Sequence, residues 1–248
     1  MKVFSVVGIT QSGKTTTIEN IIKELRRRGY SVGSVKDIHF EKFAMDTEGT
    51  NTYRHKQSGS QLVTARGNYE TDILFQKRLS MDEILNFYNH DFVVLEGVRD
   101  FNVPKIITAH SKNEVLERLD DLVFAISGRI SNELKEFEGL RVINIMDNVE
   151  KLVDLIEEKV YHRLPDFPEE CCGKCGYTCR QLGALILKGQ AKREDCVLVN
   201  SKVKLQIDEK DIDMVPFVQN ILSNAVLGVV KELDGYVEGK EITVKILP

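Results

Sequence analysis

The sequence lacks the features that would place it among nucleic acid-binding, membrane-spanning or repetitive proteins. Its 34 lysines and arginines against 38 acidic residues give a net charge of −4, without the polybasic surface that follows a phosphate backbone. The most apolar long stretch, residues 215–230, is interrupted by Gln219, Asn220, Ser223 and Asn224, so it is too polar to span a bilayer. No cleavable leader, internal repeat or low-complexity tract is visible. We therefore expect a globular cytoplasmic protein with no nucleic acid or membrane partner.

The length of 248 residues predicts one large domain or one domain with a small appendage. Composition changes at residues 164–171, where two of the five prolines and three acids form a plausible linker. We expect a P-loop nucleotide-binding domain over residues 1–164 and a cysteine-rich α+β domain over residues 165–248.

The most informative motif is an apolar strand that runs directly into Gly8-x4-Gly13-Lys14-Thr15. Glycines at both ends of this turn let backbone N–H groups approach a phosphate, while Lys14 reaches the β- and γ-phosphates and Thr15 offers a hydroxyl to Mg²⁺. The alternative is a glycine-containing turn that binds nothing. The predicted phosphate-binding residues are Gly8, Thr10, Gln11, Ser12, Gly13, Lys14, Thr15 and Thr16.

A second candidate phosphate strand covers residues 91–97 and delivers Glu96 and Gly97 to its end. Glu96 could bind Mg²⁺ through water or orient a nucleophile, and Gly97 could approach the γ-phosphate. The alternative is an exposed acid that closes an ordinary strand. Asp91, at the strand start, is more typical of a structural residue.

Residues 46–55 combine cationic, acidic and aromatic groups in one polar stretch. Arg54 could neutralise phosphate charge, and Asp46 could accept hydrogen bonds from a substrate. A solvated helix start capped by Thr50 or Asn51 explains much of the same sequence, and the residues alone leave both interpretations open.

Strands alternate with helices along the first domain, which predicts an α/β P-loop NTPase fold whose mostly parallel sheet is flanked by helices. The expected strands are residues 3–7, 31–40, 60–64, 71–75, 92–95, 122–126 and 142–145, and the expected helices begin at residues 14, 80 and 149. In the second domain we expect strands at residues 197–200, 203–207 and 241–247 and a helix at residues 215–232.

Four of the five cysteines crowd between Cys171 and Cys179. Cys172, Cys175, Cys179 and Cys196 supply the four thiolates that a 4Fe-4S cluster needs, and a helix ended by Gly189 would bring Cys196 back to the first three. Zinc is the alternative, although zinc sites more often pair two CxxC knuckles. Cys171 is an ambiguous fifth thiol.

Four segments together resemble the molybdopterin-guanine dinucleotide biosynthesis protein B family. They are residues 8–16 (GITQSGKTT), the strand end at 36–39, residues 46–59 (DxxGxxTYRHxxxG) and residues 95–106 (LEGVRDxxVPKI). Thr50 and Asn51 stand where the family usually has lysine and aspartate, and Arg99 replaces a common lysine.

This resemblance implies a dimeric P-loop protein that binds GTP and Mg²⁺, hydrolyses GTP weakly and assists a guanylyltransferase that joins GMP to molybdopterin. It also implies that Arg54 and His55 belong to a mobile loop near the nucleotide or pterin and that Glu96 lies beside the γ-phosphate. Guanine selection follows only from the resemblance, because no NKxD-like segment is visible and residues 126–129 are the nearest strand-end candidate.

The cysteine segment resembles the four-cysteine iron-sulfur domain of corrinoid iron-sulfur proteins, with one residue fewer between the second and third cysteines. We therefore expect a GTP-binding accessory protein of molybdenum or tungsten cofactor maturation. The alternatives are a nucleotide-gated iron-sulfur electron-transfer or cluster-delivery protein and a pure interaction adaptor. A small-molecule kinase would need an arginine-bearing lid, and Arg26, Arg27 and Arg28 are more typical of a solvated helix end.

Overall fold

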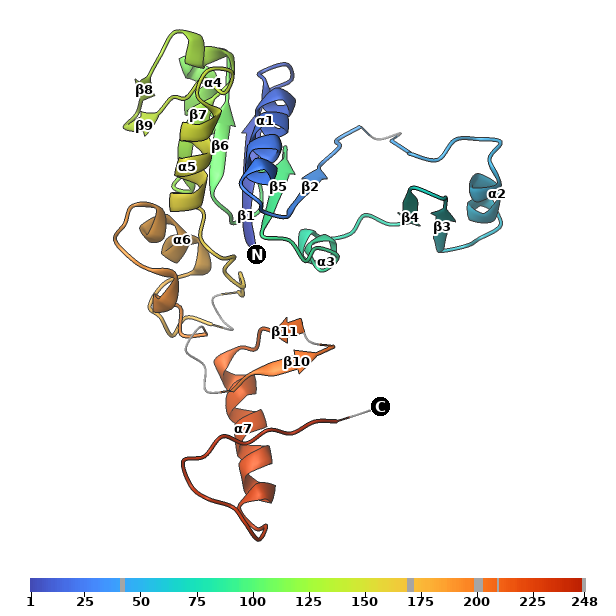
Figure 1. The fold of residues 1–248 in the computed structure, drawn as a ribbon, viewed down its shortest axis with the longest axis vertical. Helices are drawn as coiled ribbons and strands as arrows, with labels where there is room; N and C mark the ends of the chain where they lie inside the picture. The colour runs from blue at the N-terminus through green and yellow to red at the C-terminus, as the bar shows by residue number, and fades with distance from the viewer. Residues whose placement is uncertain (41–42, 169–171, 199–202, 209, 247–248) are drawn as a thin grey trace. The chain divides into compact units, whose positions relative to one another are not determined.

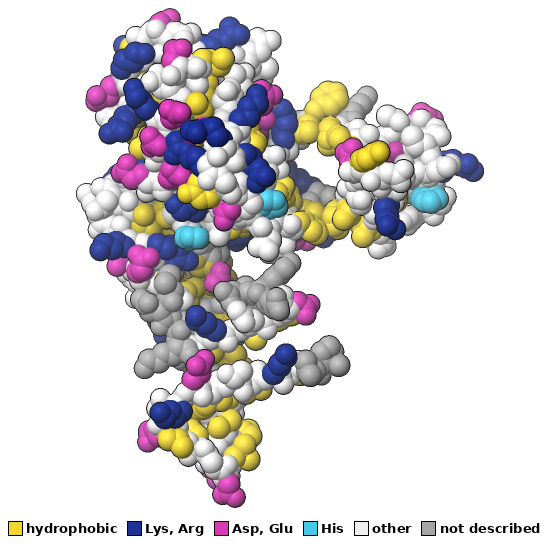
Figure 2. Space-filling view, viewed as in Figure 1, with side chains coloured by type: hydrophobic (Ala, Val, Ile, Leu, Met, Phe, Trp, Pro, Cys, Tyr) yellow, Lys and Arg dark blue, Asp and Glu magenta, His cyan; other side chains and the backbone are white. Residues whose placement is uncertain are grey.

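The computed structural model describes residues 1–40, 43–168, 172–198, 203–208 and 210–246 (Figure 1). The chain divides into two compact units, Met1–Arg163 and Leu164–Pro248. On the face shown in Figure 2, Lys and Arg side chains alternate with Asp and Glu side chains over the first unit.

The first unit is built on a five-stranded sheet in which β1 holds the central place. The strand order is β2-β5-β1-β6-β7, and every neighbouring pair is parallel. Strands β5, β6 and β7 are buried at almost every position, as expected for a parallel sheet covered on both faces. The strands are β1 (Lys2–Gly8), β2 (Val32–Lys36), β5 (Phe92–Glu96), β6 (Lys105–Thr108) and β7 (Val123–Ser127). This architecture confirms the predicted α/β fold.

Two longer helices accompany this sheet, α1 (Lys14–Arg27) and α5 (Val149–Lys159), and they pack against each other. Glycines fix the ends of α1, because Gly13 at its start has a φ of 101° and Gly29 after its end a φ of 92°. The shorter helices are α3 (Met81–Leu85), α4 (Lys112–Leu116) and η1 (Arg129–Asn132).

The contact between α1 and α5 is charged. Glu24 is 5% exposed and accepts hydrogen bonds from both Arg27 and Arg28. Arg28 is 19% exposed and also pairs with Asp154 and Glu157 of α5. The prediction of a solvated helix end is therefore wrong for Arg28, which joins the two helices.

Residues between β2 and β5 form a small substructure of α2 (Asn51–Gln57), β3 (Leu62–Arg66) and β4 (Thr71–Phe75). The Thr50 hydroxyl accepts a hydrogen bond from the Tyr53 backbone N–H and so caps α2. The segment therefore contains the capped helix start that its sequence allows, while a binding role for Arg54 or Asp46 stays a prediction. Strands β3 and β4 pair antiparallel as a hairpin.

Several expected strands differ from those observed. The strand expected at residues 31–40 ends at Lys36, and residues 142–145 contribute a single parallel bridge between Val142 and Ile126. Strand β6 and helix α4 had no counterpart among the expected elements, and neither did the short hairpin of β8 (Glu136–Phe137) and β9 (Leu140–Arg141).

The second unit contains α6 (Cys179–Leu187), η2 (Arg193–Asp195), the hairpin of β10 (Leu205–Ile207) and β11 (Lys210–Ile212), and α7 (Pro216–Val230). Strand β10 pairs with β11; of its expected partner, residues 197–200, 197–198 lie in a turn and 199–200 lie outside the described residues. Residues 241–246 form no strand, and residue 247 lies outside the described residues.

Helix α7 exposes large apolar side chains, and hydrophobic atoms are visible around it in Figure 2. Phe217 is 70% exposed and Val229 is 66% exposed. Within the described residues, no helix combines the length and apolar character that crossing a bilayer requires.

Candidate functional site

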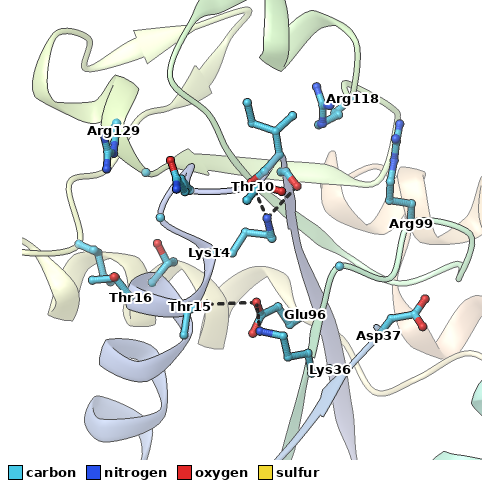
Figure 3. A pocket seen from close by; sticks show the side chains of 18 of the residues that line it. Thr10, Lys14, Thr15, Thr16, Lys36, Asp37, Glu96, Arg99, Arg118 and Arg129 are labelled. Atoms are coloured by element: carbon cyan, nitrogen blue, oxygen red, sulfur yellow. Dashed lines mark hydrogen bonds and ion pairs between the residues drawn. The ribbon is translucent and has the colours of Figure 1, made fainter. Parts of the chain in front are cut away.

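The carboxyl ends of the parallel strands surround a pocket of about 930 Å³ at the start of α1 (Figure 3). The loop from Gly8 to Gly13 forms its centre, since β1 is the middle strand and α1 begins at Lys14. The predicted residues that line the pocket are Gly8, Thr10, Gln11, Gly13, Lys14, Thr15, Thr16, Glu96 and Gly97. Ser12 and Arg54 are not among the lining residues.

Close backbone contacts explain the glycine at the start of the loop. A Cβ placed on Gly8 would lie 2.2 Å from the Thr108 carbonyl oxygen of β6. The glycine therefore lets β1 and β6 meet beneath the loop, which leaves the loop backbone available to an anion above it.

Ser12 supports the loop from below. Its side chain is buried and donates to the Ile9 carbonyl oxygen at 2.8 Å, and the Ser12 and Thr108 hydroxyls lie 2.8 Å apart. Ser12 thus holds the loop conformation through its side chain, and the predicted contact of the loop with phosphate at this position stays a prediction.

The Lys14 ammonium group lies over the loop. Its Nζ donates to the carbonyl oxygens of Gly8 at 2.9 Å and Ile9 at 2.5 Å. Burial lowers the pKa of Lys14, while nearby Glu96 opposes that effect. The loop carbonyl oxygens thus accept the hydrogen bonds that the Lys14 ammonium group would donate to a bound phosphate.

Thr15, Glu96 and Lys36 form a connected group on one side of the loop. The Thr15 hydroxyl donates to Glu96 Oε1 at 3.1 Å, and Lys36 Nζ donates to the same oxygen at 3.0 Å (Figure 3). Register explains the arrangement, because Lys36 and Glu96 are paired residues at the ends of β2 and β5.

The pocket carries an excess of positive charge. Its described lining holds five lysine and arginine side chains and two carboxylates, a balance suited to a polyanion. The cations are Lys14, Lys36, Arg99, Arg118 and Arg129, and the carboxylates are Asp37 and Glu96 (Figure 3). No motif in the sequence marks Arg118, whose place depends on the order of the strands.

The far side of the pocket is lined by Asn132, Asn144, Ile145 and Met146, which follow β7 and the Val142 bridge. Asn144 Nδ2 donates to Asn132 Oδ1 at 2.9 Å, and the Met146 backbone N–H donates to Asn144 Oδ1 at 2.9 Å. Sequence reasoning missed these residues, since its nearest candidate was the adjoining segment 126–129.

The residues predicted around Arg54 lie on and before α2. Asp46 accepts hydrogen bonds from the hydroxyls of Thr50 and Thr52, and the Thr50 hydroxyl is the main cause that lowers the pKa of Asp46. Asp46 therefore stabilises the start of α2, and Arg54 is exposed on that helix.

No disulfide joins the four described cysteines of the second unit. Cys172 and Cys196 are buried, and burial raises the pKa values of the Cys172 and Cys179 thiols. In the described part of the chain, no three or more Cys, His, Asp or Glu side chains are grouped so that they could hold a metal ion. The structure thus does not support the predicted 4Fe-4S site. Cys171 lies outside the described residues.

The family model described as molybdopterin guanine dinucleotide synthesis protein B, or MobB, matches residues 3–128. The chain belongs to the MobB family. The matched range contains the glycine-rich loop, Lys36 and Glu96, and it confirms the family resemblance drawn from the four segments.

Curated MobB relatives cover different shares of this chain. A protein of Methanocaldococcus jannaschii, provisionally named a molybdopterin-guanine dinucleotide biosynthesis adapter protein, is 29% identical over 99% of this chain and 97% of its own. The molybdopterin-guanine dinucleotide biosynthesis adapter protein of Haemophilus influenzae is 26% identical over 63% of this chain and 88% of its own.

A crystal structure of MobB from Bacillus subtilis shares the fold. It matches with a TM-score of 0.56 and 23% identity, covering 66% of this chain and all of that one. The alignment with the M. jannaschii relative therefore extends over the second unit, whereas the B. subtilis fold covers only two thirds of the chain.

Proposed function

We propose that this chain binds GTP with Mg²⁺, hydrolyses it slowly and acts as an adapter in the formation of the molybdopterin guanine dinucleotide cofactor of molybdenum or tungsten enzymes. The names of its relatives support the pathway. The convergence of Lys14, Thr15 and Glu96 on one positively charged pocket is the observation that carries the nucleotide site.

The geometry of Thr15 and Glu96 fits a magnesium ion. Two oxygen ligands at right angles, each about 2.1 Å from Mg²⁺, lie about 3.0 Å apart. The observed separation of Thr15 Oγ1 and Glu96 Oε1 is 3.1 Å. These two residues would hold the ion, which would neutralise charge that develops on the transferred phosphoryl group.

In this proposal Lys14 leaves the loop carbonyls for the phosphates, and the loop N–H groups bind the phosphate oxygens. Glu96 would help to hold the ion and would orient the attacking water, while Lys36 balances the charge of Glu96. Arg54 lies on α2 and outside the pocket lining, and its role near the nucleotide stays a prediction.

The proposed partners are a molybdenum cofactor guanylyltransferase and molybdopterin. A homodimer is also proposed, on the family resemblance alone. Slow hydrolysis suits an adapter, since the nucleotide state would then report on the partner rather than supply a metabolic product. The second unit would act as an accessory to the nucleotide-binding unit.

The nucleotide site is tested by titrating the full chain with GTP and Mg²⁺ in a calorimeter. Lys14→Ala should weaken binding at least about 100-fold, because a desolvated charged contact is lost. Lys23→Ala is the matched control, since Lys23 is exposed on the same helix. Equal binding by Lys14→Ala and the parent would exclude the site.

The adapter role needs a separate measurement. GTP hydrolysis is followed with and without a guanylyltransferase, together with the yield of the dinucleotide cofactor. Addition of this protein should raise the yield in the parent and not in Lys14→Ala. A yield that does not depend on this protein would contradict the pathway while leaving the nucleotide site intact.

A metal centre at Cys172, Cys175, Cys179 and Cys196 is proposed on their spacing. Anaerobic protein should show the absorption and EPR spectra of a 4Fe-4S cluster. A colourless protein with one zinc would refute the cluster.

A further inference from the structure

The pocket has two chemically different sides, and the nucleotide site proposed above defines which side would face the phosphates and which would face the nucleobase. Thr15 and Glu96 lie at the side formed by β5 and β2. Thr15 and Glu96 would hold a magnesium ion that neutralises the terminal phosphates, so the nucleoside would extend away from Glu96. The opposite side, beyond β6 and β7, is lined by Arg129, Asn132 and residues 144–146.

The two asparagine side chains on that side have a defined orientation. The Met146 backbone N–H can only donate, so the Asn144 atom that receives it at 2.9 Å is the oxygen. The other Asn144 atom is then the amide nitrogen, and the Asn132 atom that it meets at 2.9 Å is again an oxygen. This chain of contacts leaves the Asn132 NH₂ group as a hydrogen-bond donor.

Met146 adds an apolar surface beside these donors. Its side chain is 70% exposed although it lines a pocket that is otherwise rich in charge. Ile145, its neighbour, is buried at 5% exposure and supports it. An exposed thioether next to amide donors matches a flat aromatic ligand with polar edges, because sulfur packs favourably on aromatic rings.

We propose that Asn132, Asn144 and Met146 form a nucleobase subsite selective for 6-oxopurines, an inference that rests on the proposed nucleotide function. The Asn132 amide group donates to O6 of guanine, and Met146 packs on the ring; N7 accepts hydrogen bonds in adenine as well, so the selectivity comes from O6. Adenine presents a 6-amino donor at the same edge, so two donors would face each other.

The subsite does not read the 2-amino group of guanine. Among the described lining residues, the carboxylates are Asp37 and Glu96, and both belong to the phosphate side. Asp147 is exposed and is not part of the lining. Hypoxanthine, which has O6 and N7 but no 2-amino group, is therefore accepted as well as guanine.

The test is calorimetric titration of the full chain with GTP, ITP and ATP in the presence of Mg²⁺. GTP and ITP should bind within about twofold of each other, and ATP at least about tenfold more weakly. Asn132→Asp keeps an oxygen toward Asn144 and replaces the free donor by an acceptor. The added charge of this variant should weaken the binding of all three nucleotides, but its ratio of GTP affinity to ATP affinity should also fall at least about tenfold.

Asp147→Asn is the control, since it alters an exposed neighbour outside the pocket, and its affinity ratios should equal those of the parent. Equal binding of GTP and ATP by the parent, or an unchanged ratio in folded Asn132→Asp, would overturn the subsite. A strong preference for GTP over ITP that disappears in Asp147→Asn would also overturn it, in favour of a carboxylate that reads guanine. A parent that binds none of the three nucleotides would instead refute the nucleotide function itself.

Discussion

Gly128 lies directly against Ser12 of the glycine-rich loop. The Arg129 backbone N–H donates to the Ser12 carbonyl oxygen at 3.3 Å, and a Cβ on Gly128 would lie 2.3 Å from that same oxygen. The segment after β7 thus supports the loop from a position more than a hundred residues away in the sequence. The loop conformation consequently depends on β7 as well as on its own glycines.

Gly128→Ala should destabilise the fold by about 3 kcal/mol or more and weaken GTP binding. The added methyl group clashes with backbone, and φ 81° with ψ −158° is a conformation that essentially only glycine adopts. Gly139→Ala is the control, because Gly139 also has a positive φ, 72°, but open space around its Cβ position, and it should cost about 1 kcal/mol. Chemical unfolding and calorimetry measure both effects, and equal costs for the two variants would contradict the contact argument.

Glu96→Gln should separate magnesium binding from phosphate binding. The variant keeps the size of the side chain and loses the charge that meets Thr15 and Lys36. We expect GTP affinity to become nearly independent of Mg²⁺ and hydrolysis to fall at least about tenfold, because an ion ligand is lost. Titrations with and without Mg²⁺ test this. Glu19→Gln, on the exposed surface of α1, should retain the parent's Mg²⁺ dependence.

Glu24 should make the stability of the first unit depend on acid pH. Hydrogen bonds from Arg27 and then Arg28 lower its pKa from 4.5 to about 2. Because the folded pKa is depressed, this contribution is complete above about pH 5 and is lost as pH falls from 4.5 towards 2. Unfolding measured across this range should show a flatter curve for Glu24→Gln, which should also lose about 2 kcal/mol at pH 7. Unchanged pH dependence in this variant would contradict the assignment.

The correct predictions of pocket residues came from local sequence motifs. The glycine-rich loop and the acid that ends β5 are contiguous patterns, so Lys14, Thr15 and Glu96 could be placed in one pocket before the structure was known. Arg118, Asn132 and Asn144 could not, because nothing in their own neighbourhood marks them. They reach the pocket through the order of β1, β6 and β7, which depends on long-range pairing.

The errors have similar physical causes. Strand β6 was missed because it begins at a lysine that follows a proline, a pattern that does not indicate a buried strand, yet Lys105 is only 3% exposed. The strand expected at residues 142–145 is apolar enough to be buried, but its pairing is limited to Val142. In the second unit, alternation of apolar residues indicated a strand at residues 203–207 without fixing its partner, and β10 pairs with β11.

Lys105→Met should test how the structure positions Arg99 in the pocket. Lys105 Nζ donates to the Arg99 carbonyl oxygen at 2.8 Å and to Asp120 at 2.7 Å, so a buried ammonium group fixes the backbone that carries Arg99. Removing it leaves two acceptors without their charged donor and should cost about 2–4 kcal/mol of stability. Nucleotide affinity should fall with it, since Arg99 lines the pocket.

The matched control for this variant is Lys77→Met. Lys77 pairs with Glu83 at 2.9 Å, but the two side chains are 65% and 46% exposed, so the pair should contribute less than about 1 kcal/mol. Chemical unfolding and GTP titration of both variants compare a buried with an exposed lysine. If Lys105→Met loses stability but retains the parent's GTP affinity, then Arg99 keeps its place without Lys105. That outcome would contradict a positioning role for Lys105 and would mean that the strand ends alone set the charge of the pocket.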